Sequence, residues 1–212
     1  MIYLFVFLVG VLLFGIGESA AADRPAHYFP LSLGNRWVYT SSEGSPTDPV
    51  TEVWEVIRRK ESGFVMRVRQ SLLAKDSPAE FISVLPDGIV MQMHNDQLNE
   101  QSVDAAQQFI LKSPLHLGRT WHTQDGRYEI TALDGFAAVP ADVFSRCLEV
   151  TFWSRNGQVK AVTLYAPGVG MVQRDESFAI LGSVGGEGSP RQGKVSLWLT
   201  EWQVAAELGP NH

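Results

Sequence analysis

Apolar and polar residues alternate along most of the chain with a period of two. In the stretch FVMRVRQ, Phe64, Met66 and Val68 fall on one side of the chain and Arg67 and Arg69 on the other. Three later stretches, RYEITAL, CLEVTFW and KVSLWLTEW, alternate in the same way. A two-residue period is typical of a strand with one buried and one wetter face, as in antiparallel sheets. The pattern therefore predicts an all-β protein.

Short turn signals separate these stretches at the spacing of hairpins. Asn156-Gly157 stands between LEVTFWSR and QVKAVTLY, and Asp87-Gly88 stands between FISVL and IVMQMH. The central residues of a type I′ turn need positive φ, which Asn, Asp and Gly tolerate best. One segment, NEQSVDAAQQFILK, favours a helix through its alanines. We predict an antiparallel barrel or half-barrel of eight to ten strands, with at most one short helix.

One phrase occurs twice in the chain. FPLSLGNRW, residues 29–37, and SPLHLGRTW, residues 113–121, share the frame P-L-x-L-G-x-x-W. In each copy Pro restricts the residue before it, Gly permits a turn that a side chain would obstruct, and Trp begins a strand. A second echo, LPDGIVMQ and later YAPGVGMVQ, follows each copy at a nearly equal distance. The residues assigned to this structural motif are Pro30, Leu31, Gly34, Trp37, Pro114, Leu115, Gly118, Trp121, Pro167, Gly168 and Gly170.

Self-similarity of this kind indicates a repeated supersecondary unit. We therefore divide the chain into a signal peptide at residues 1–22 and a single β domain at residues 23–212. Within that domain we expect repeat one at about residues 28–95, repeat two at about residues 112–176 and a closing hairpin at residues 177–205.

The first residues predict export. An apolar run from Ile2 to Gly17 precedes the small residues Ala20-Ala21-Ala22, which is typical of a secretory signal peptide cleaved at an A-x-A-like site. The run is shorter than the roughly 20 residues that cross a bilayer as a helix, so we expect a periplasmic or extracellular mature chain without a membrane span. Because no Lys or Arg precedes the run, a retained membrane anchor stays an alternative. No cysteine stands directly after the run, at the position where a lipid would be attached, so we expect no lipid at the amino terminus.

Composition excludes some classes of partner. The formal net charge is −6, with 17 Lys and Arg against 23 Asp and Glu, so the chain lacks the basic footprint of a nucleic-acid-binding protein. Cys147 is the single cysteine. An exported chain of this kind has no internal disulfide and depends on packing for its stability.

Three stretches resemble motifs of a group of uncharacterised exported bacterial envelope proteins, among them lipoprotein-type members. ILKSPLHLGRTW, VPADVFSRCLEV and TLYAPGVGMVQRDE are similar to that group's P-L-x-x-G-x-x-W, V-P-A-G-x-F-x-x-C-x-x-V and Y-A-P-G-V-G-x-V motifs. Asp142 stands where the group has glycine. The resemblance covers roughly residues 28–201 and implies an envelope location and a curved antiparallel sheet or barrel, like lipoprotein carriers or lipocalins. It implies no catalytic residues.

The residues that could carry chemistry do not form a recognisable set. His116 and His122 are six positions apart, which on an extended chain separates them by roughly 20 Å, too far for one metal ion. The G-x-S-x-G turn of serine hydrolases does not occur in the sequence. We therefore predict no catalytic residue, no metal site and no cofactor. An enzyme assembled from residues distant in sequence stays a third alternative.

The tryptophans supply the candidate binding site. Trp153, Trp198 and Trp202 stand opposite the aliphatic residues of their strands, so both faces of these strands carry apolar side chains. A second apolar face needs a cover, which can be another part of the barrel, a partner protein or an apolar ligand. We predict a non-catalytic envelope protein that binds a lipid, another apolar small molecule or an envelope protein in a curved sheet, with these tryptophans lining the site. The alternative is a structural or assembly module whose aromatic residues all pack in the core.

Overall fold

The computed structural model describes residues 24–45, 48–71, 80–93, 108–180 and 191–205. The predicted signal peptide lies outside these residues. The described part begins with a short helix, α2 (Pro25–Tyr28), which has Pro at its first position and buries Tyr28. Proline is favoured there because the first helical N–H would have no partner in the helix.

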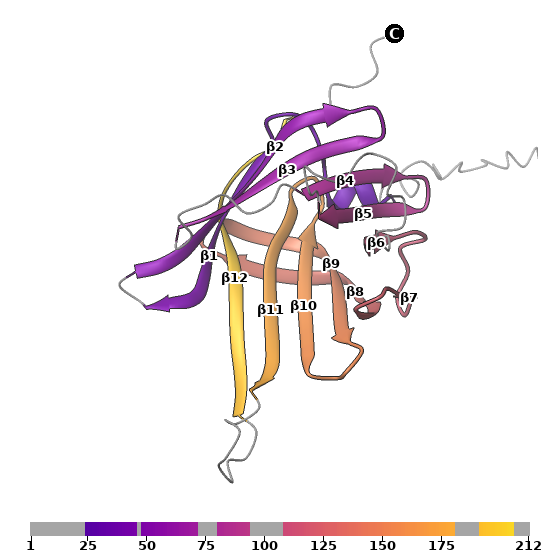
Figure 1. Cartoon of the computed structure of the whole chain (residues 1–212). Helices are drawn as coiled ribbons and strands as arrows, with labels where there is room; N and C mark the ends of the chain where they lie inside the picture. The colour runs from indigo at the N-terminus through magenta and orange to yellow at the C-terminus, as the bar shows by residue number, and fades with distance from the viewer. Residues whose placement is uncertain (1–23, 46–47, 72–79, 94–107, 181–190, 206–212) are drawn as a thin grey trace, which may run out of the picture.

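Twelve strands follow the helix and form one antiparallel sheet. They are β1 (Arg36–Ser45), β2 (Asp48–Lys60), β3 (Gly63–Gln70), β4 (Glu80–Leu85), β5 (Gly88–Met93), β6 (Gln108–Lys112), β7 (Thr120–His122), β8 (Gly126–Val139), β9 (Asp142–Ser154), β10 (Val159–Ala166), β11 (Gly170–Ile180) and β12 (Arg191–Gln203). The sheet curls into a nearly closed barrel (Figure 1). The predicted all-β fold class is confirmed, whereas the predicted count of eight to ten strands is too low for the described residues.

The order of the strands divides the sheet into two meanders. From one edge to the other the order is β6-β5-β4-β3-β2-β1-β12-β11-β10-β9-β8-β7. The pairing of β1 with β12 joins the two meanders in the middle of the sheet, and the edge strands β6 and β7 follow one another in the chain. Across these edges the indole nitrogen of Trp121 donates a hydrogen bond of 2.8 Å to the carbonyl oxygen of Phe109. This bond ties the two edges of the barrel together.

The helix predicted over residues 99–112 is wrong in its described part. Residues 94–107 lie outside the described structure, and Gln108–Lys112 form β6. Leu111 pairs with Ile89 of β5, and both side chains are fully buried. Burial against a neighbouring strand outweighs the helix preference of the preceding alanines, because propensity contributes little beside tertiary packing.

The core lies on the inner face of the barrel, as the alternation predicts. On β3, Met66 and Val68 are buried in the core, while Arg67 and Arg69 each reach a carboxylate oxygen of Glu55 on β2, at 3.1 and 3.2 Å. The same strand thus separates an apolar inner face from a charged outer one.

The repeated phrase folds into the same turn in both copies. The amide nitrogen of Gly34 donates to the carbonyl of Val56 at 2.9 Å, and the amide nitrogen of Gly118 donates to the carbonyl of Ile130 at the same distance. Both glycines have positive φ, +86° and +78°, and a Cβ atom on either would meet nothing within 4 Å. The frame therefore needs Gly for its backbone conformation. The division of the chain into two repeats with the stated boundaries stays a prediction.

Each copy of the phrase also lies against a hairpin turn of the other meander. The indole nitrogen of Trp37 donates a bond of 2.6 Å to the carbonyl of Val169, in the turn between β10 and β11. The amide of Ser113, at the start of the second copy, donates a bond of 2.8 Å to the carbonyl of Asp87, in the turn between β4 and β5. These turns carry the second echo found in the sequence.

The contact of Trp37 with the β10–β11 turn gives a first prediction. Gly170 has φ +114°, and a Cβ atom there would lie 3.2 Å from Nε1 of Trp37. We expect Gly170→Ala to lower the free energy of unfolding by about 2–4 kcal/mol, because backbone strain adds to overpacking. Urea-induced unfolding measures this change.

Gly157→Ala is the matched control for this substitution. Gly157 has φ +69°, and a Cβ atom there would meet nothing within 4 Å, so we expect the backbone strain alone, about 1–2 kcal/mol. Equal losses in the two variants would contradict the proposed packing of Trp37 against Gly170.

Candidate functional site

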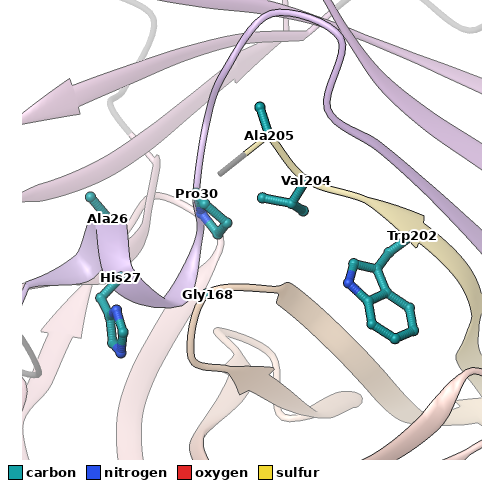
Figure 2. Close-up of a pocket in the computed structure, with 7 residues that line it drawn as sticks. All are labelled: Ala26, His27, Pro30, Gly168, Trp202, Val204 and Ala205. Atoms are coloured by element: carbon teal, nitrogen blue, oxygen red, sulfur yellow. The ribbon is translucent and has the colours of Figure 1, made fainter. Parts of the chain in front are cut away.

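A pocket of about 330 Å³ lies where α2, the β10–β11 turn and the end of β12 meet (Figure 2). Its lining residues are Ala26, His27, Pro30, Gly168, Trp202, Val204 and Ala205. Figure 2 shows His27 and Trp202 at opposite ends of this group, with Gly168 between them. Small-molecule pockets measure roughly 300–1,000 Å³, so this pocket has the size for a small ligand.

A short backbone hydrogen bond fixes one wall of the pocket. The amide nitrogen of Gly168 donates to the carbonyl oxygen of His27 at 2.7 Å. Gly168 has φ +71°, a conformation that glycine adopts without a steric penalty. The bond holds the β10–β11 turn against α2, so two segments distant in sequence form one surface.

Asn35 fixes the opposite wall and was not predicted from the sequence. The side chain is fully buried; its Nδ2 donates to the carbonyl of Pro30 at 3.1 Å, and its Oδ1 accepts from the amide of Ala205 at 2.9 Å. In the second copy of the phrase Arg119 has this position, and its Nη2 donates to the carbonyl of Ser113 at 3.2 Å. In both copies the residue directly after Gly can form side-chain hydrogen bonds, and this shared property was the feature of the sequence that could have indicated the role of Asn35.

Trp202 lines the pocket, but on a different face from the predicted one. It pairs with Trp37 across the strands, and Leu199 pairs with Tyr39, so one extra β12 residue lies between the two pairs. This bulge moves Trp202 to the inner face, where Trp37 and Tyr39 also lie. Trp202 is 38 % exposed, and its indole makes an edge contact with Phe144, with ring centroids 5.5 Å apart.

The other two predicted tryptophans lie on the outer face and away from this pocket. Trp153 is partly covered by cations: the guanidinium carbon of Arg127 lies 4.4 Å from its ring centroid, and Nζ of Lys160 lies 6.0 Å away. The face of an aromatic ring attracts a cation, and the long side chains of Arg127 and Lys160 also cover apolar surface of Trp153. Trp198 is half-buried opposite Thr40. The structure therefore does not bring the three tryptophans together.

The predicted structural residues divide between the pocket, the core and the surface. Pro30 and Gly168 line the pocket, and Leu31 packs partly buried against the core. Leu115, Trp121, Trp37 and Gly170 are buried, Pro167 is half-buried, and Gly34, Pro114 and Gly118 are exposed. Both tryptophans of the phrase thus belong to the core.

The described residues hold no group of three or more His, Cys, Asp and Glu side chains that could bind a metal ion. His116 is exposed, with Nδ1 at 3.1 Å from the carbonyl of Leu117. Cys147 is fully buried, and burial raises the pKa of its thiol. A thiol in this environment stays protonated and is a poor nucleophile.

In the part of the chain that the structure covers, no helix is long and apolar enough to cross a membrane.

The fold defines an all-β protein with a nearly closed antiparallel barrel. No protein-family model matches the chain, and no curated protein matches it. Two crystal structures are similar in fold. A candidate exported protein with a YmcC-like fold from Bacteroides fragilis is 13 % identical with a TM-score of 0.47, covering 82 % of this chain and 98 % of its own. A candidate lipoprotein from Parabacteroides distasonis is 11 % identical with a TM-score of 0.40, covering 84 % and 98 %. Likeness at this level says nothing of what the chain binds.

The bonds of Asn35 give a second prediction. We expect Asn35→Ala to lower the free energy of unfolding by about 2–3 kcal/mol, because the Pro30 carbonyl and the Ala205 amide both lose a partner. Hydrogen exchange of the Ala205 amide should also accelerate. Chemical denaturation and exchange measured by mass spectrometry would test both effects.

The exposed turn residue Asn156 serves as the control. Its side chain bonds to Ser154 and Gln158 in the β9–β10 turn, where water can replace both partners, so we expect Asn156→Ala to cost about 1 kcal/mol or less. An unchanged exchange rate at Ala205 in Asn35→Ala would show that Asn35 does not hold this wall.

Proposed function

We propose that this chain is an exported, non-catalytic envelope protein that binds an apolar small molecule in the pocket beside Trp202. The observation that carries the proposal is the pocket itself, about 330 Å³ in volume and lined by Pro30, Trp202 and Val204 among others. None of its seven described lining residues is Asp, Glu, Lys or Arg. Ala26, Pro30, Trp202, Val204 and Ala205 supply apolar side chains, and His27 is the one titratable side chain in the lining. Such a lining suits an apolar ligand, because no carboxylate, ammonium or guanidinium group must lose its water when the ligand binds.

The exposure of Trp202 supports a ligand over a purely structural role. One side of the indole contacts Phe144, and part of the remaining surface borders the pocket. A tryptophan residue that is 38 % exposed leaves apolar area in contact with water, and each Å² of that area that a ligand covers contributes about 25 cal/mol. A structural module would instead pack this ring in its core.

The construction of the walls supports binding without a large rearrangement. The bond from Gly168 to His27 and the two bonds of Asn35 hold the surrounding segments in place before any ligand arrives. A preformed pocket reduces the entropy lost on binding. The export of the chain rests on the apolar leader at residues 1–22 and its small-residue cleavage site.

Binding of the neutral apolar fluorophore N-phenyl-1-naphthylamine tests the proposal. We expect saturable binding to the protein purified without detergent, and a dissociation constant raised about tenfold or more in Trp202→Ala, because the ring supplies one side of the pocket. A factor of ten corresponds to about 1.4 kcal/mol, a small part of the stacking and burial that a tryptophan supplies.

Trp198→Ala is the matched control, since Trp198 lies on the same strand but on the outer face. We expect its dissociation constant to stay within about twofold of the original. Wild-type affinity in Trp202→Ala, or an equal loss in both variants, would overturn the pocket as the binding site. Near-ultraviolet circular dichroism confirms that each variant is folded.

A further inference from the structure

Arg174 lies on the inner face of the barrel, among core positions. It pairs with Leu197 of β12 and with Thr163 of β10, and the same row continues to Val150 and Ile130. Residues directly opposite one another on paired strands share a face of the sheet. Because Leu197, Val150 and Ile130 are buried in the core, the side chain of Arg174 points to the inside.

Two tyrosine rings lie within electrostatic reach of this guanidinium. Burial raises the pKa values of the Tyr128 and Tyr165 phenols, and the charge of Arg174 lowers both in part, so the guanidinium lies within electrostatic reach of both rings. Tyr128 is stacked on Trp121 at 5.4 Å and contacts Phe152 at 4.7 Å between ring centroids. A cation thus lies beside an aromatic wall formed by β7, β8 and β9.

Water reaches Arg174 in spite of its inward direction. Its Nη2 donates to Oε2 of Glu176 at 2.9 Å, and the side chains are 43 % and 34 % exposed. An ion pair exposed to this degree stabilises a fold little, so a second anion can replace or share the carboxylate. Guanidinium has five N–H donors in a planar fork that suits carboxylate, sulfonate and phosphate groups.

Glu52, another charge of the inner face, is already engaged by neighbouring side chains. It lies on β2 in the row of Tyr39 and accepts hydrogen bonds from Nε1 of Trp54 at 3.1 Å and Nε2 of Gln70 at 2.6 Å. Because β2 belongs to the first meander, this carboxylate does not share the strands that carry Arg174. In the row of paired residues that runs from Ile130 to Leu197, Arg174 is the residue with a positive charge.

We infer that the inner face of β8–β11 binds an organic anion, whose charged group pairs with Arg174 and whose apolar part lies against Tyr128 and Phe152. This site is separate from the pocket beside Trp202, since none of these residues lines that pocket. The ligand class is an amphiphile with a single acidic group, because one guanidinium stands beside an extended aromatic surface.

The test compares two probes that share one ring system. 1-Anilinonaphthalene-8-sulfonate is N-phenyl-1-naphthylamine with one added sulfonate, so the difference between them isolates the anionic group. We expect Arg174→Gln to raise the dissociation constant of the sulfonate probe about tenfold and to leave that of the neutral probe within twofold. We expect Glu176→Gln to lower the dissociation constant of the sulfonate about two- to fivefold, because a competing carboxylate is removed.

Arg127→Gln is the matched control on the outer face. Arg127 also pairs with a glutamate two residues further along its strand, Glu129 at 3.1 Å, and its side chain has the same exposed fraction, 43 %. We expect no change in sulfonate binding in this variant. Equal losses in Arg127→Gln and Arg174→Gln, or no loss in Arg174→Gln, would overturn the inner-face site.

The outcome is independent of the proposed function. Trp202→Ala should weaken the neutral probe and leave sulfonate binding at Arg174 unchanged, so failure of one site is distinguishable from failure of the other. Circular dichroism and unfolding curves of Arg174→Gln establish that the variant is folded, which an exposed ion pair allows.

Discussion

The hydrogen bond from the indole of Trp37 to the carbonyl of Val169 is the contact on which much of the structure depends. Trp37 is the second residue of β1, the strand whose pairing with β12 joins the two meanders. Phe29 stacks on its ring at 6.0 Å, which places α2 and Pro30 against the β10–β11 turn. The pocket beside Trp202 exists because this one buried ring holds three segments together that are distant in sequence.

The tryptophans of the two copies act at different places in the barrel. Trp37 acts at the central junction of the sheet, whereas Trp121 bonds to Phe109 across its two edges. The residue after the glycine then decides what each copy builds. Asn35 reaches Ala205 beyond the last strand and shapes a pocket, while the longer Arg119 bonds back to its own turn. The two copies therefore form the same turn, but the side chain after the glycine contacts a different part of the protein in each copy.

Local patterns predicted most of the strands, because the two-residue period of β3, β8, β9 and β12 is visible within each segment. Gln108–Lys112 of β6 was assigned to a helix because of the alanines that precede it, so the strand count was too low. The face of Trp202 could not be predicted, since the bulge that moves it depends on pairing with β1. The pocket and the inner position of Arg174 likewise arise from register between strands. Trp202, the one predicted lining residue that borders the pocket, was chosen from its place in the alternating pattern of its strand, whereas the other lining residues meet there through tertiary packing.

A crystal structure of residues 23–212 grown with N-phenyl-1-naphthylamine would show whether the pocket beside Trp202 binds an apolar molecule. We expect the fluorophore between Trp202 and Pro30, with the hydrogen bonds of Asn35 to Pro30 and Ala205 unchanged from the protein without ligand. A Trp202 side chain folded into the pocket, with the fluorophore bound elsewhere or absent, would contradict it. The barrel would then be a scaffold at this end, and its binding surface would have to lie in another part of the molecule.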